Sequence, residues 1–224
     1  MKIIATSLAR LGRATTISAF PIWALATPAF AENEVAIILD LAEPVCRSVE
    51  LPAAVRLQAL QSLGWQATPE NVSIDTLAAA QVATELANNQ IDLDAQNEEF
   101  EFLKTVISKR LADDFDSGGL AARWFTNPAN PNLGLMFASA SMQGFKLSEC
   151  QFVISAPDDQ TLADITNLFS LSRARVTAVG TLFRSGDAVD TEGGQIVMSH
   201  QLVLLDEPSN AAVLSLSISQ IGAP

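Results

Sequence analysis

Residues 212–221, AVLSLSISQI, alternate between apolar and polar side chains with a period of two. Leu214, Leu216 and Ile218 fall on one side of an extended chain, and the serines between them fall on the other. Successive side chains of a β-strand point to opposite faces of its sheet. The stretch therefore predicts a strand of an antiparallel sheet with one buried face and one wet face.

Similar stretches precede it. Strands are predicted at residues 120–125, 133–142, 145–155, 175–183 and 194–205. The predicted turns, rich in glycine, proline, asparagine and aspartate, are residues 126–132, 184–193 and 206–210. Between the third and fourth strands, Pro157 and Asp158 open a short helix whose apolar positions end at Phe169. The predicted order is β-β-β-α-β-β-β, and its short turns favour hairpins.

The chain before residue 117 has a helical pattern instead. Helices are predicted at residues 34–43, 52–64, 74–89 and 94–115. The last of these places four apolar residues on one face, namely Phe100, Leu103, Ile107 and Leu111. Pro44 is expected to end the first helix and Gly64 the second. The fold class predicted is α+β, with a helical part (34–116) packed on one face of a mostly antiparallel sheet (120–220) in a single domain, residues 32–224.

The first 31 residues have the composition of a secretory signal peptide. Lys2, Arg10 and Arg13 precede an uncharged segment, residues 14–26, and small residues at Ala29 and Ala31 follow. This order predicts export and cleavage between Ala31 and Glu32. The alternative is an uncleaved anchor, although the apolar segment is shorter than the roughly 20 residues that span a bilayer.

Charge and cysteine content restrict the class of protein further. The formal net charge of −12 disfavours nucleic acid as a partner, and it disfavours a membrane partner once the signal is removed. Cys46 and Cys150 are the only cysteines, and in an oxidising compartment they are expected to form a disulfide. The alternative is two buried free thiols. The chain has no CxxC motif, which argues against a thiol oxidoreductase.

Few residues suggest chemistry. His200, the single histidine, lies in phase with apolar neighbours, so it is a candidate general base or an ordinary core histidine. Asp113, Asp114 and Asp116 resemble part of a calcium loop, but the oxygen ligand at position five and the glutamate at position twelve are missing. No spacing selects a pair of carboxylates for glycoside cleavage. Trp65 and Trp124 are interpreted as core residues.

These observations favour an exported, periplasmic, non-catalytic binding or accessory module of the cell envelope. Its partner would be an envelope protein or a small ligand. No cofactor is expected, because the chain has neither a phosphate-binding glycine loop nor a dinucleotide fingerprint. The alternative is an envelope hydrolase without a recognisable motif that uses His200 or paired carboxylates.

Overall fold

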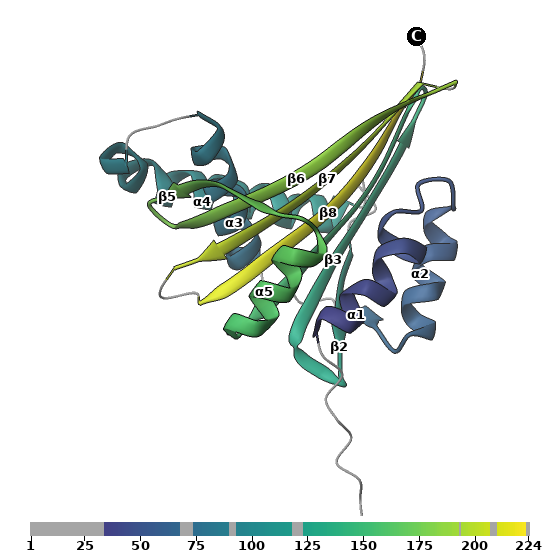
Figure 1. Ribbon diagram of the computed structural model, residues 1–224, viewed down its shortest axis with the longest axis horizontal. Coiled ribbons are helices and arrows are strands. Elements are labelled where there is room, and N and C mark those ends of the chain that lie inside the picture. The colour runs from purple at the N-terminus through teal and green to yellow at the C-terminus, as the bar shows by residue number, and fades with distance from the viewer. Residues whose placement is uncertain are drawn as a thin grey trace, which may run out of the picture. The chain divides into compact units, whose positions relative to one another are not determined.

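The computed structural model describes residues 34–67, 74–89, 93–117, 123–192, 194–206 and 210–222. Their strands form one antiparallel sheet with the order β1-β2-β3-β4-β8-β7-β6-β5. The strands are β1 (Gln66–Ala67), β2 (Arg123–Asn127), β3 (Asn130–Met142), β4 (Phe145–Ser155), β5 (Ser172–Thr177), β6 (Gly180–Thr191), β7 (Gly194–Leu205) and β8 (Ala211–Gly222). Figure 1 shows the long central strands crossing the molecule as one twisted layer.

The sheet contains more strand than the sequence predicts. The segment predicted as one strand, 175–183, is the hairpin β5–β6. At the start of β6, Gly180 lies so close to β7 that a Cβ on it would be 2.1 Å from the Leu204 carbonyl oxygen. The predicted turn at 184–193 is also wrong, because β6 continues beside β7 as far as the Thr191–Gly194 pair. Continuous pairing with β7 outweighs the local turn preference of the glycine and aspartates there.

Six helical segments accompany the sheet in the described residues. They are α1 (Glu34–Leu41), η1 (Ala42–Cys46), α2 (Ala53–Ser62), α3 (Ile74–Asn89), α4 (Leu93–Ser117) and α5 (Asp159–Leu168). Pro44 does not end the first helical stretch as predicted. The chain continues as one π-helical turn, closed by the hydrogen bond from Arg47 N to Ala42 O at 2.9 Å. This wider turn includes a proline, which has no N–H to donate.

Two helix ends and one helix face agree with the sequence prediction. Gly64 has φ +86° and follows Leu63, the C-cap residue of α2. Asp158 caps α5, since its carboxylate accepts a hydrogen bond from Thr161 N at 2.7 Å. On α4, Ile107 and Leu111 are buried, and Phe100 and Leu103 pack against the same cluster.

The helices cover both faces of the sheet, which corrects the predicted arrangement on one face (Figure 1). α1, η1, α2 and α5 pack on the face that carries Phe137, Phe152 and Leu214. α3 and α4 pack on the opposite face, over Val153 and Val213 among others. The reason is that β4 and β8 place adjacent apolar residues on opposite faces, so each face needs its own cover.

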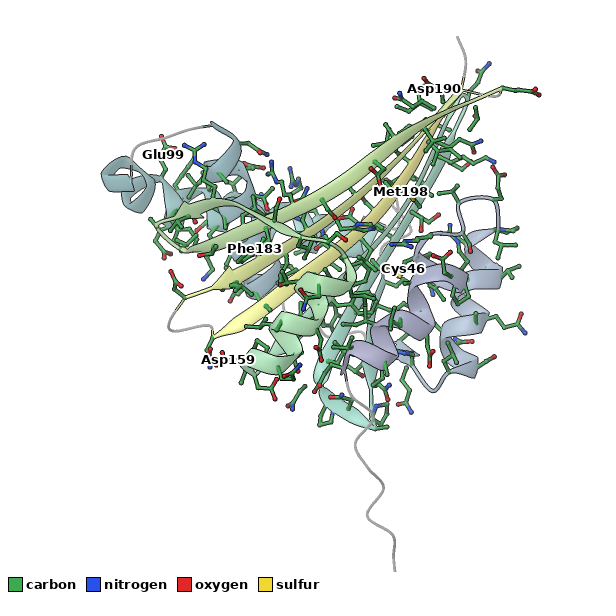
Figure 2. The ribbon with its side chains drawn as sticks, in the orientation of Figure 1. Cys46, Glu99, Asp159, Phe183, Asp190 and Met198 are labelled. Atoms are coloured by element: carbon green, nitrogen blue, oxygen red, sulfur yellow. A yellow bond between two sulfur atoms is a disulfide. The ribbon has the colours of Figure 1, made fainter. Side chains whose placement is uncertain are left out.

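The predicted disulfide is confirmed. It joins Cys46 of η1 to Cys150 of β4, with the Cα atoms 5.5 Å apart and both residues fully buried (Figure 2). The bond links segments separated by 104 residues of sequence and attaches the first helices to the middle of the sheet. Trp65 and Trp124 are also core residues as predicted, at 2% and 4% exposure.

Candidate functional site

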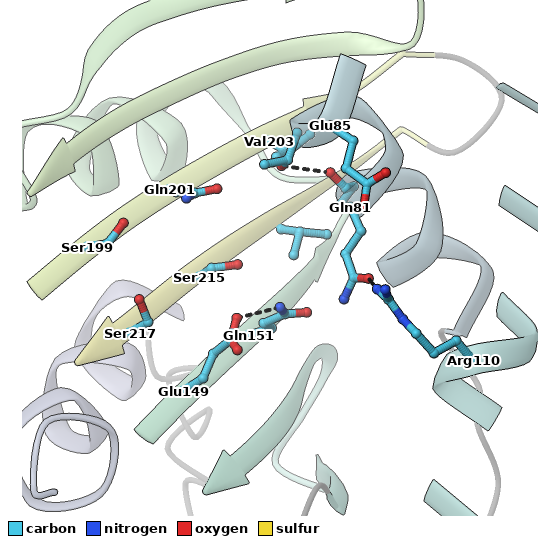
Figure 3. A pocket seen from close by; sticks show the side chains of 13 residues that line it. Gln81, Glu85, Arg110, Glu149, Gln151, Ser199, Gln201, Val203, Ser215 and Ser217 are labelled. Carbon is cyan, nitrogen blue, oxygen red and sulfur yellow. Dashed lines mark hydrogen bonds between the residues drawn. The ribbon is translucent and has the colours of Figure 1, made fainter. Parts of the chain in front are cut away.

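A pocket of about 290 Å³ lies between α3 and the sheet (Figure 3). Its wall comes from α3 and α4, and its floor from β4, β7 and β8. The wall is made by Ala80, Gln81, Thr84, Glu85 and Arg110. The floor is made by Glu149, Gln151, Ser199, Gln201, Val203, Val213, Ser215 and Ser217. The pocket is therefore a mainly polar hollow bounded by two helices and three strands.

Strand register explains why this floor is polar. Residues paired across neighbouring strands share a face, and two such rows cross the pocket. One row is Gln201, Ser215 and Gln151, and the next is Ser199, Ser217 and Glu149. The preceding row on the same face is Val203, Val213 and Val153, which belongs to the core under α3. The face thus changes from apolar to polar within two residues along each strand.

Glu149 carries the ionisable group of the floor. Its Oε1 accepts a hydrogen bond from Gln151 Nε2 at 2.7 Å. Burial raises the pKa of the Glu149 carboxyl above its ordinary value, and the bond from Gln151 opposes that rise. The ion pairs among the described residues are Arg47–Glu43 and Lys146–Glu50, so no cationic side chain there neutralises Glu149.

The helical wall holds the other charged groups of the pocket. Arg110 Nη2 donates a hydrogen bond to Gln81 Oε1 at 3.0 Å, which ties α4 to α3 beside the opening. Glu85 lies one turn further along α3. Figure 3 shows Gln81 and Arg110 on the helical side and Glu149 with Gln151 on the strand side. The pocket can therefore offer a ligand amide, hydroxyl and carboxylate groups from opposite walls.

His200 lies on the opposite face of β7 from this pocket. Its Nε2 is 2.9 Å from Arg47 Nη2, and its Nδ1 is 3.2 Å from Ser185 Oγ. A guanidinium only donates, so Nε2 is the acceptor and Nδ1 carries the proton. That proton goes to Ser185, whose hydroxyl donates in turn to Phe169 O at 2.6 Å.

This chain of hydrogen bonds has the wrong direction for a nucleophilic serine. A Ser–His nucleophile needs the hydroxyl to donate to the imidazole, whereas the Ser185 hydroxyl donates to a carbonyl. Burial lowers the pKa of His200, the charge of Arg47 lowers it further, and Asp187 opposes both. Catalysis through His200 would therefore require this chain to rearrange.

The acidic candidates for calcium binding lie on a helix. Asp113, Asp114 and Asp116 belong to the last turns of α4, which runs to Ser117, and the glycines that follow lie outside the described residues. Asp113 is exposed. Within the described ranges, no group of three or more His, Cys, Asp or Glu residues is placed to hold a metal ion. The predicted signal segment and its cleavage site at Ala31 and Glu32 also lie outside the described residues.

Sequence reasoning missed the pocket. The serines of β8 were predicted to face water, but Ser215 and Ser217 lie on its floor. The available signal was the run Glu149–Gln151 on one strand and Ser199–Gln201 on another, each polar at alternate positions. Only the strand order brings these runs together on either side of β8.

No helix in the described ranges is long and apolar enough to cross a membrane. No protein-family model matches the chain, and neither a curated protein nor a solved structure shows significant similarity to it.

Proposed function

We propose that this chain is an exported, periplasmic, non-catalytic binding protein of the cell envelope, and that the pocket under α3 is its binding site. The observation that carries the proposal is the pocket of about 290 Å³ with Glu149 on its floor. Ligand pockets combine a concave shape with a few convergent polar groups, and ionisable groups with shifted pKa values gather in them. Glu149 forms no ion pair among the described residues. A half-buried carboxylate of this kind costs stability, and a binding role gives a reason for it.

Two features support the periplasmic location. The first 31 residues have the order of a secretory signal, and the Cys46–Cys150 disulfide is compatible with an oxidising compartment. Expression of the full chain in a bacterium tests this directly. We expect the periplasmic product to have the mass of a chain that begins at Glu32. Its two cysteines should be alkylated only after reduction. A product that keeps residues 1–31 and alkylates at both cysteines without reduction would contradict export.

The binding site is tested by native mass spectrometry of protein taken from the periplasmic fraction. We expect a small molecule to accompany the wild type and to be released on denaturation. Ser217→Leu would fill the floor of the pocket and remove that molecule. Ser219→Leu is the matched control, because Ser219 lies two residues further on the same face of β8 and does not line the pocket. If Ser217→Leu and Ser219→Leu carry the small molecule to the same extent, the ligand binds outside this pocket.

A hydrolase that uses paired carboxylates is the second candidate, and one observation favours it. Glu85 and Glu149 both line the pocket, and burial raises the pKa of Glu149. Glycoside hydrolysis uses two carboxyl groups, one of them a proton donor with a raised pKa. A panel of chromogenic glycosides separates the two functions. We expect no turnover by the wild type. If the wild type does hydrolyse a glycoside and Glu149→Gln does not, the protein is a hydrolase and not a binding protein.

A further inference from the structure

Glu149 is the ionisable side chain on the strand floor of the pocket, since the residues contributed there by β7 and β8 are serine, glutamine and valine. Among the charged side chains of the neighbouring elements, Glu85 of α3 and Arg110 of α4 line the pocket, and Arg184 of β6 is paired with Gln201 on the same face of the sheet. Both guanidinium groups are already engaged. Arg110 donates to Gln81 at 3.0 Å, and Arg184 donates to Asn88 at 2.6 Å. Neither forms an ion pair with Glu149 among the described residues.

The hydrogen bonding of Glu149 leaves one oxygen available. Gln151 donates to Oε1, and no described side chain donates to Oε2. A planar guanidinium gains most when it meets both oxygens of a carboxylate at once. An ammonium group is a point charge with three donors and needs only one carboxylate oxygen plus two neutral acceptors. The serine hydroxyls and glutamine carbonyls of the same floor, including Ser217 beside Glu149, can supply those acceptors.

We infer that the pocket binds a small solute through a primary ammonium group, with the Glu149 carboxylate as its counter-ion and the neighbouring serine and glutamine side chains as its further acceptors. This inference rests on the proposed binding function and names the chemical class of its ligand. The ammonium group neutralises a carboxylate that forms no ion pair with any described side chain. Charge-assisted hydrogen bonds of this kind are about twice as strong as neutral ones.

The rest of the molecule favours a cation and limits its size. The full chain carries a formal charge of −12, which raises the local concentration of cations around it. Glu85 adds negative charge on the helical wall. The volume of about 290 Å³ lies near the lower end of the range for small-molecule sites, which begins at about 300 Å³. A compact amine fits this space, whereas a folded partner protein would present at most one lysine side chain to it.

The test uses the exported protein, freed of its own ligand by dialysis, and isothermal titration at pH 7. The probe is butylammonium, compared with butanol, which has a similar shape and no charge, and with tetramethylammonium, which has the charge and no N–H donor. We expect butylammonium to bind most tightly, and Glu149→Gln to weaken it by about tenfold or more. Lys109→Gln, at an exposed position of α4, is a charge control and should leave the affinity unchanged.

Each outcome distinguishes this inference from the function on which it rests. Equal affinity for butylammonium in the wild type and Glu149→Gln overturns the counter-ion assignment. If Ser217→Leu still removes the ligand that accompanies the protein in native mass spectra, the pocket remains the binding site and only the ligand class is wrong. Binding of a lysine-containing peptide but not of butylammonium overturns the small solute. If every pocket variant keeps both butylammonium and the ligand that accompanies the protein, the binding function is overturned as well.

Discussion

Arg47 donates a hydrogen bond from Nη2 to His200 Nε2 at 2.9 Å, which links the residue after η1 to the middle of β7. Because Arg47 cannot accept, this contact is made only when the imidazole is neutral. Protonation would place a proton against the guanidinium and add a second positive charge. The half-buried position and Arg47 together lower the pKa of His200.

The first prediction is that His200 makes the fold sensitive to acid. The pKa of His200 is lowered in the folded chain, while in the unfolded chain it should lie near the ordinary value of about 6.5. Below about pH 6.5 the unfolded state therefore binds more protons, and the free energy of unfolding falls as pH decreases. The fall continues until the pH lies below the folded pKa. Urea denaturation between pH 8 and pH 4 measures this slope.

His200→Gln is the matched variant, because its side-chain carbonyl can still accept from Arg47 and does not titrate. Between pH 6.5 and pH 4, we expect the free energy of unfolding to fall less for the variant than for the wild type. A variant as sensitive to acid as the wild type would show that other groups cause the loss.

The second prediction concerns the cost of Glu149. Its raised pKa means that the folded state holds its proton more tightly than the unfolded state, so ionisation at neutral pH destabilises the fold. Glu149→Gln keeps an acceptor for Gln151 and removes the charge. We expect the variant to unfold at a higher urea concentration than the wild type at pH 7. The difference should vanish below the unfolded pKa of about 4.3, where both side chains are neutral.

A loss of stability in Glu149→Gln at pH 7 would contradict this prediction. It would mean that a contact of the ionised carboxylate stabilises the fold, and the reason for assigning Glu149 to ligand binding would disappear. The stability measurement is independent of the titration with butylammonium.

The third prediction concerns the disulfide. Cys46 and Cys150 are fully buried and enclose a long loop, so their bond restricts the unfolded chain strongly. Replacing both residues by alanine is expected to cost about 2–5 kcal/mol, the usual range for a native disulfide. Urea denaturation of the double variant and the oxidised wild type measures the difference. Equal midpoints and equal slopes would show that the packing of η1 on β4 does not depend on the bond.

Local patterns in the sequence predicted the parts of this fold that depend on near neighbours. The apolar face of α4, the cap at Asp158 and the alternation of β8 each follow from spacing within one element. The extent of β6 does not follow from the spacing of residues within one element. Gly186 and Asp187 favour a turn by themselves, and only pairing with Ser199 and Met198 of β7 makes them strand.

The pocket depends on still longer-range information. Glu149 has ordinary neighbours in sequence, and its environment is set by Ser217 beside it on β8 and by α3 above. The division of the helices between the two faces depends on similar information, because β4 and β8 offer an apolar surface on both sides. No spacing within one segment identifies the helix that covers each face, so the prediction of a single covered face was wrong.

The fourth prediction concerns the packing of the sheet under α3 and α4. A Cβ on Gly134 of β3 would lie 2.3 Å from Cζ2 of Trp124 on β2, far inside van der Waals contact. The indole is buried in the cluster formed by α3, α4 and the sheet, so it has little room to move away. Gly134→Ala is therefore expected to destabilise the fold by about 1–3 kcal/mol, as overpacking commonly does.

A double-mutant cycle shows whether the indole is the cause. Trp124→Leu alone should destabilise the fold, because it leaves a cavity in the cluster. With Trp124→Leu already present, Gly134→Ala should cost much less, since the ring that its methyl group would meet has gone. The expected coupling is about 0.5–3 kcal/mol between these contacting residues, measured from urea midpoints of the four proteins. If the two costs are strictly additive, the alanine acts on the strand backbone. In that case, the close approach of Trp124 is not the reason for glycine at position 134.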